Sequence, residues 1–267
     1  MTFNKFAKTL GLISLGSVLG GLFLSAPSVK ADSDMAPVCP SSGMPADGDC
    51  RKSPDHYEIT IYEMGLCTTD PVNASYTTYD KSSCITTFSS GGTSANLANG
   101  NVVNLGEKVA PNPGTYTHAY LVMAPSFKLK GQQTTSAGVY SSNSSGVAVL
   151  NQSGGAKTFT EDMRSFDTQE CSGYAYANMS GGFMKAMLLN SSMQSIGTNC
   201  GSTARIGTSF KPNSGIVITP QTKGLEVRFA VNNYGLSVYD QDAQGELCGQ
   251  DICGFGSGPF QPSFQTF

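Results

Sequence analysis

Alternating apolar and polar positions recur along the chain with the spacing of β-strands. One such alternation is at 56–64, where Tyr57, Ile59 and Ile61 fall on one face and mostly polar side chains on the other. This is the pattern of a strand with one buried face. The segment 114–123 has the same character and ends before Pro125, which cannot continue a central strand.

Shorter segments carry the same signal and are separated by turns rich in Gly, Asn and Ser. Segment 183–189 fits either a strand or a short helix, because its Met, Leu and Ala residues suit both. About ten short strands with turns between them predict an all-β fold, a single antiparallel β-sandwich of jelly-roll or immunoglobulin-like type with long polar loops. The other expected strands are 101–105, 127–130, 146–150 in a hairpin within 134–155, 173–177, 204–210, 215–219, and 225–231 paired with 235–239 across Asn232 and Asn233.

The beginning of the chain has the features of a secretory signal peptide. Two lysines precede an uncharged, largely apolar segment, and Val29 and Ala31 stand at the small-residue positions that a signal peptidase recognises. An uncleaved membrane anchor is disfavoured, because the apolar segment is short and rich in glycine. We expect a signal peptide at 1–31, an irregular N-terminal arm at 32–54 and a β-sandwich domain at 55–267.

Charged residues make up only 13% of the chain, and Ser, Thr, Asn and Gly take their place. Removal of residues 1–31 takes away three lysines and no acids, which leaves thirteen basic and nineteen acidic residues, a net charge near −6. Such a chain lacks the basic patches that bind nucleic acid or anionic membranes. With no membrane span after cleavage, the expected partners are a protein or glycan surface.

Eight cysteines follow the signal peptide, and an even number in an exported chain favours disulfides. Zinc is disfavoured, because there is no C-x-x-C pair and the only two histidines are far apart. Closing a short loop costs the least entropy. We therefore expect the pairs Cys39–Cys50, Cys67–Cys84, Cys171–Cys200 and Cys248–Cys253.

The segment 239–253 partly matches a twelve-residue calcium loop, which makes calcium the one cofactor that the sequence offers. The match is incomplete, because Cys248 occupies the ninth position and a strand, not a helix, leads into the loop. The alternative is a polar turn, in which Asp and Gly serve backbone geometry and a bridge at Cys248 competes with wrapping an ion. The candidate ligands are Asp240, Asp242, Gln244, Glu246 through its carbonyl, and Asp251.

Hydrolase signatures such as G-x-S-x-G and H-E-x-x-H are absent from the sequence. A Ser-His-Asp triad would need His56 or His118. We interpret His118 as a partly buried residue in a row with Tyr116 and Tyr120. Carboxylates from separate strands leave glycoside hydrolysis open.

Eleven tyrosines and no tryptophan are present, and several tyrosines lie close together in sequence. Tyrosines two or four residues apart on a strand share one face, so a stripe of them can bind a sugar or a protein. The alternative is packing across a sheet face. The three groups are Tyr76 with Tyr79, Tyr116 with Tyr120, and Tyr174 with Tyr176.

These features together predict an exported, non-enzymatic protein of the cell surface or periplasm with a binding, adhesive or structural role. The first alternative is a carbohydrate-binding or calcium-stabilised module. The second is a secreted hydrolase that uses carboxylates from separate strands.

Overall fold

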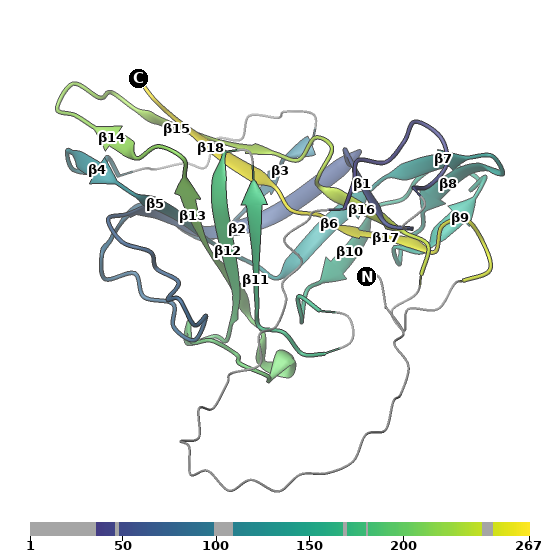
Figure 1. Cartoon of the computed structure of the whole chain (residues 1–267), viewed down its shortest axis with the longest axis horizontal. Helices are drawn as coiled ribbons and strands as arrows, with labels where there is room; N and C mark the ends of the chain where they lie inside the picture. Colours follow the sequence, from purple (N-terminus) through teal and green to yellow (C-terminus); the bar gives the residue numbers. More distant parts are fainter. Residues whose placement is uncertain (1–35, 46–47, 99–108, 168–169, 180, 242–247) are drawn as a thin grey trace, which may run out of the picture.

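The computed structural model of the chain describes residues 36–45, 48–98, 109–167, 170–179, 181–241 and 248–267 (Figure 1). The predicted signal peptide and the expected strand at 101–105 lie outside these residues. The elements are β-strands, apart from the three-residue 3₁₀ helix η2 (Cys200–Ser202). The all-β prediction is confirmed.

The largest sheet has the strand order β10-β6-β2-β5-β13-β12-β11, and β3 pairs with the other side of β2. Neighbouring strands are antiparallel. The strands are β2 (His56–Cys67), β3 (Cys84–Asn96), β5 (His118–Met123), β6 (Ser126–Lys130), β10 (Phe159–Asp162), β11 (Tyr174–Met179), β12 (Gly182–Leu189) and β13 (Arg205–Pro212).

The long strand β2 connects two halves of this sheet. Its first residues pair with β6, whereas the segment from Ile61 to Cys67 pairs with β5. Register shifts after Ile61 and Met64 interrupt the ladder. Since bulges bend a strand and increase its twist, the sheet curls, and β2 crosses the middle of the molecule between the two halves (Figure 1).

The remaining strands form smaller antiparallel sheets around the large one. The result is several sheets, some of them curled, and not simply the two facing sheets expected for a sandwich. The smaller sheets consist of β1 (Cys50–Lys52), β16 (Leu236–Tyr239) and β17 (Gly254–Ser257); β7 (Gln132–Thr135), β8 (Gly138–Ser142) and β9 (Ala148–Leu150); β4 (Gly114–Tyr116) with β14 (Ile216–Ile218); and β15 (Leu225–Ala230) with β18 (Gln261–Thr266).

The core lies against the apolar face of β2. Tyr57, Ile59 and Ile61 are at most 1% exposed, as the alternating pattern predicts. They belong to one cluster with Leu236 and Phe255 from the β1-β16-β17 sheet. The Tyr57 hydroxyl donates a hydrogen bond to the Gly258 carbonyl (2.9 Å), which satisfies the one polar group that this face buries.

Four disulfides link the expected local pairs. They are Cys39–Cys50, Cys67–Cys84, Cys171–Cys200 and Cys248–Cys253, and no cysteine in the described residues is free. Cys39–Cys50 closes a loop within the N-terminal arm at 32–54. This arm contains the short strand β1, where we expected irregular structure. Four disulfides are typical of an oxidising compartment outside the cytoplasm.

Two local predictions are settled by long-range pairing. Segment 183–189 is part of strand β12, since β11 and β13 both pair with it. The expected hairpin across Asn232 and Asn233 is wrong. A turn forms there, with Asn233 at φ 63°, but β15 pairs with β18, and β16 with β1 and β17. The turn therefore carries the chain from one sheet to another.

Candidate binding surface

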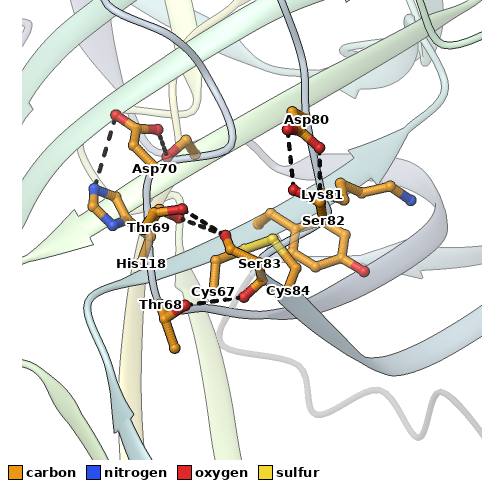
Figure 2. The surroundings of a disulfide bond; sticks show 12 residues. Cys67, Thr68, Thr69, Asp70, Asp80, Lys81, Ser82, Ser83, Cys84 and His118 are labelled. Atoms are coloured by element: carbon orange, nitrogen blue, oxygen red, sulfur yellow. Dashed lines mark hydrogen bonds and ion pairs between the residues drawn. A yellow bond between two sulfur atoms is a disulfide. The ribbon is translucent and has the colours of Figure 1, made fainter.

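A disulfide-closed loop at 68–83 crosses one face of the large sheet (Figure 2). Cys67 and Cys84 face each other on β2 and β3 and are bridged. Just above the bridge, the Thr69 hydroxyl donates a hydrogen bond to the Ser83 hydroxyl (2.7 Å). The loop therefore has a narrow, fixed base.

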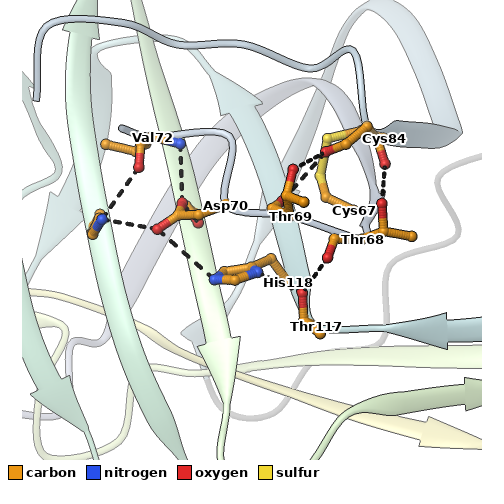
Figure 3. A network of polar contacts seen from close by, with 11 residues as sticks. Cys67, Thr68, Thr69, Asp70, Val72, Cys84, Thr117 and His118 are labelled. Carbon is orange, nitrogen blue, oxygen red and sulfur yellow. Dashed lines mark hydrogen bonds and ion pairs between the residues drawn. A yellow bond between two sulfur atoms is a disulfide. The ribbon is translucent and has the colours of Figure 1, made fainter. Parts of the chain in front are cut away.

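Asp70 fastens this loop to the strands beneath it (Figure 3). Its carboxylate accepts hydrogen bonds from Lys185 Nζ on β12 (2.8 Å), the Ser209 hydroxyl on β13 (2.6 Å) and the Val72 backbone N–H (3.0 Å). His118 Nε2 on β5 lies 3.8 Å from the same carboxylate. One side chain of the loop thus binds three neighbouring strands.

The charges in this network are set by hydrogen bonds and by burial. Burial alone would raise the pKa of Asp70, but the hydrogen bonds from Lys185 and Ser209 outweigh it and hold the pKa below the ordinary 3.8. Burial lowers the pKa of His118 below 6.5, and the attraction of Asp70 does not compensate. At neutral pH Asp70 is therefore ionised and forms an ion pair with Lys185, and His118 is a neutral neighbour.

A second polar cluster holds the C-terminal end of the loop, close to Cys84. Glu63 on β2 accepts hydrogen bonds from Lys81 (2.5 Å), the Tyr120 hydroxyl (2.5 Å) and the Thr86 hydroxyl (2.9 Å). Burial opposes ionisation of Glu63, but these three donors lower its pKa below 4.5. Each carboxylate is satisfied by the protein itself.

The Asp70 network has the residue types of a hydrolase triad but not its arrangement. The Ser209 hydroxyl donates to Asp70, whereas His118 Nδ1 lies 2.9 Å from the hydroxyl of Thr117. That hydroxyl is itself bonded to the Thr68 carbonyl (2.7 Å). A triad requires the nucleophile to be hydrogen-bonded to the imidazole. The described geometry fits a structural network.

Tyr76, at the tip of the loop, stacks on Tyr174 and Tyr176 of β11. The ring centroids of Tyr76 and Tyr174 are 4.4 Å apart with planes at 17°, and those of Tyr76 and Tyr176 are 5.8 Å apart at 22°. All three residues are half-buried. We call Tyr76, Tyr174 and Tyr176 the tyrosine platform. It joins two of the groups noticed in the sequence, which no local pattern connects.

The turn that presents Tyr76 is held by the side chain of Asn73. Its Oδ1 accepts the backbone N–H groups of Thr77 (2.8 Å) and Thr78 (3.1 Å), and its Nδ2 donates to the Ser75 and Thr77 hydroxyls. Tyr76 itself has φ 54°, a conformation that costs a bulky residue energy. The turn therefore fixes the ring over β11.

The hydroxyls of the tyrosine platform have no hydrogen-bond partner among the described residues, whereas those of Tyr57 and Tyr120 do. Burial raises the pKa of Tyr76 above 10, and the neighbouring Tyr176 and Tyr174 add to this. The Tyr76 phenol is therefore neutral at physiological pH. The three hydroxyls offer polar groups to a ligand at the edge of an aromatic surface.

The proposed calcium loop falls largely outside the described residues, which exclude Asp242, Gln244 and Glu246. Asp240 is half-buried, and its Oδ1 has no hydrogen-bond partner. Asp251 is exposed, and Cys248 is bridged to Cys253, the condition that opposes wrapping an ion. Among the described residues no group of three or more potential metal ligands gathers.

Two further features bear on enzymatic alternatives. Burial and, after it, the nearby Asp240 raise the pKa of Asp49, but neither carboxyl lines the pocket under the β15–β18 ribbon or the one between residues 212–217 and β18. His56 contacts Glu58 at 3.5 Å on the surface of β2. These contacts do not define a cleft that would hold a substrate.

An apolar crevice lies on the opposite face of the sheet, under the β15–β18 ribbon. Its enclosed volume is about 30 Å³, enough for only one or two water molecules. The hydroxyls of Thr87, Tyr120 and Thr208 in its wall are bonded within the protein. The crevice is a gap between packed layers with no room for a ligand.

The chain matches no protein-family model, and searches of curated proteins and of solved structures found no match. Within the described ranges, no helix has the length and apolar character needed to cross a membrane.

Proposed function

We propose that the protein is an exported, non-enzymatic protein of the cell surface or periplasm that binds a ligand through the tyrosine platform. One observation carries this proposal. Three stacked rings, from a loop and from β11 nearly a hundred residues apart in sequence, present hydroxyls that the described protein leaves without partners. None of these hydroxyls is among the buried side-chain atoms that lack a partner, so they are open to solvent and to a ligand.

The construction around Tyr76 supports binding over packing. A tyrosine with positive φ costs of order 1 kcal/mol, and strain of this kind collects at functional sites. Here a disulfide, the Asp70 network and the Asn73 turn all hold the loop that carries Tyr76. A ring that only filled space would not need such support.

A glycan is the ligand class that we propose. The C–H face of a sugar packs on an aromatic ring, and its hydroxyls pair with phenols and with the exposed Ser75 and Thr77 beside Tyr76. Asp70 and Lys185 neutralise each other beneath the platform, so we expect a neutral sugar.

We also propose that the curled large sheet and the β1-β16-β17 sheet act as the two layers of a sandwich. Val238 and Phe255 of the small sheet share one core cluster with Ile59 and Leu129 of the large one. This scaffold would hold β11 in place while leaving its tyrosine face accessible.

Binding to a glycan array tests the ligand class. We expect the chain from residue 32 onward to bind at least one neutral glycan. Loss of one aromatic contact of about 1 kcal/mol should weaken binding roughly fivefold in Tyr76→Ala and Tyr176→Ala. Tyr234→Ala, a half-buried tyrosine outside the platform, is the matched control and should bind as the wild type does.

Two results would count against this function. An array without hits removes the glycan, and unchanged binding by Tyr76→Ala removes the platform. Asp240 Oδ1 has no hydrogen-bond partner and could serve as a calcium ligand. Calcium stabilisation is therefore tested separately, by thermal unfolding with calcium and with EDTA. An unmoved midpoint excludes it.

A further inference from the structure

Strand β11 ends the large sheet, and only one of its sides is paired. The hydrogen bond from Leu188 N–H to the Gly173 carbonyl (2.7 Å) shows which residues face β12. Because backbone groups alternate along a strand, those of Ala175 and Ala177 also point to β12. Those of Tyr174, Tyr176 and Asn178 point to the open side.

A side-chain contact agrees with this assignment. The Tyr174 carbonyl accepts a hydrogen bond from the Ser172 hydroxyl (3.0 Å), so it is directed away from β12. The outward N–H and C=O groups of Tyr176 and Asn178 have no partner among the described residues. They form a free hydrogen-bonding edge in register with the tyrosine platform.

This edge lacks the devices that usually prevent strand addition. Its sequence, Tyr-Ala-Tyr-Ala-Asn-Met, contains no charge and no proline, and its pairing with β12 is regular over all six residues. The opposite end of the sheet differs, because the short strand β10 carries Glu161 and Asp162. Charged residues thus oppose the addition of a further strand at β10, and no such residues are present at β11.

We propose that β11 pairs with β11 of a second copy of this chain, antiparallel about a two-fold axis through Tyr176. In this register Tyr176 faces Tyr176 of the second copy, and Tyr174 faces Asn178. Each facing pair is of the hydrogen-bonded type and exchanges two backbone bonds, so every outward group finds a partner. The uncharged strand brings no like charges together, and the facing tyrosines form a favourable cross-strand pair.

The two-fold symmetry has a structural consequence. Facing residues of an antiparallel pair project to the same side of the sheet, so both tyrosine platforms lie on one face of a continuous sheet. The inference rests on the backbone of β11 and stands whether or not the platforms bind a glycan.

Sedimentation equilibrium over a wide concentration range tests the dimer. We expect twice the monomer mass for the wild type and a twofold lower mass for Tyr176→Pro. This proline removes an outward N–H and leaves the β12 ladder intact; far-UV circular dichroism checks that the variant is folded. Tyr176→Ala keeps the N–H and should still dimerise. Gln265→Lys, an exposed substitution on β18, controls for unrelated surface changes.

Cysteine cross-linking tests the register independently of stability. Facing residues of a hydrogen-bonded pair have Cα atoms about 5.5 Å apart, within disulfide range. Tyr176→Cys should therefore form a covalent dimer on mild oxidation, whereas Asn178→Cys, which faces Tyr174, should not. A monomeric wild type, a dimeric Tyr176→Pro, or equal cross-linking of both cysteine variants overturns the proposal.

Discussion

Replacement of Asp70 by alanine should destabilise the protein more than most single substitutions. Asp70 binds Lys185, Ser209 and the Val72 N–H, and its side chain is 28% exposed against 14% for Lys185. Its loss leaves a largely buried ammonium group without a carboxylate. Hydrogen bonds to charged groups contribute about 1.5–3 kcal/mol each and are not additive, so we expect a loss of about 3 kcal/mol.

Urea unfolding near neutral pH measures this loss. For a chain of this size, about 3 kcal/mol corresponds to a fall in Tm of roughly 9 °C. Asp70→Asn keeps an acceptor oxygen and the shape but not the charge, so it should lose less than Asp70→Ala. A double-mutant cycle with Lys185→Met isolates the ion pair and should give a coupling energy of about 1–3 kcal/mol.

The pH dependence gives a second reading of the same residue. The pKa of Asp70 is held below 3.8 in the folded protein. Its stabilising contribution is therefore complete above the unfolded pKa and is lost as pH falls through the folded pKa. The difference between wild type and Asp70→Ala should shrink in acid. A loss below about 0.5 kcal/mol, typical of ordinary surface positions, or an additive cycle would refute the reasoning.

Three other predictions follow from burial and from the disulfides. Burial lowers the pKa of His118 below 6.5, so as pH drops below 6.5 the unfolded chain protonates this histidine before the folded chain does, and stability should fall. The urea midpoint of His118→Gln should fall less with pH than that of the wild type, and an equal pH dependence of the two midpoints contradicts this. Burial raises the pKa of Glu161 above 4.5, so stability should fall as pH rises through the interval just above 4.5. Glu161→Gln can still accept the hydrogen bond from the Ser257 N–H and should abolish that fall in the same assay. A fall that persists in this variant excludes Glu161 as its source. Removing the Cys67–Cys84 bridge by double serine substitution should cost about 3 kcal/mol, measured by calorimetry, and should weaken any ligand binding that depends on Tyr76. A fall in Tm of less than about 2 °C is no more than an ordinary surface substitution causes. That result would show that the Asp70 and Glu63 contacts alone hold the loop.

Local patterns in the sequence predicted much of the fold. The alternation at Tyr57, Ile59 and Ile61 placed a strand and its buried face correctly, because burial of one sheet face repeats every second residue. The four disulfides follow the cost of loop closure. Strand β3 was missed, since its Ser, Thr and Gly residues carry almost no apolar alternation. It is a strand because β2 pairs with it from Glu58 to Cys67.

The candidate site lay beyond prediction because its contacts join distant parts of the chain. Asp70 has no distinguishing neighbours in sequence, and its partners Lys185 and Ser209 lie 115 and 139 residues away. The adjacent pair Tyr174 and Tyr176 was visible as a stripe, but the residue that completes the surface, Tyr76, comes from a loop fixed by a disulfide and two carboxylates. The alternation of apolar and polar residues along a strand indicates which face of the strand is buried. Which loop covers that face depends on the strand order of the sheet, since β5, β13 and β12 must be consecutive strands before Asp70 can reach all three.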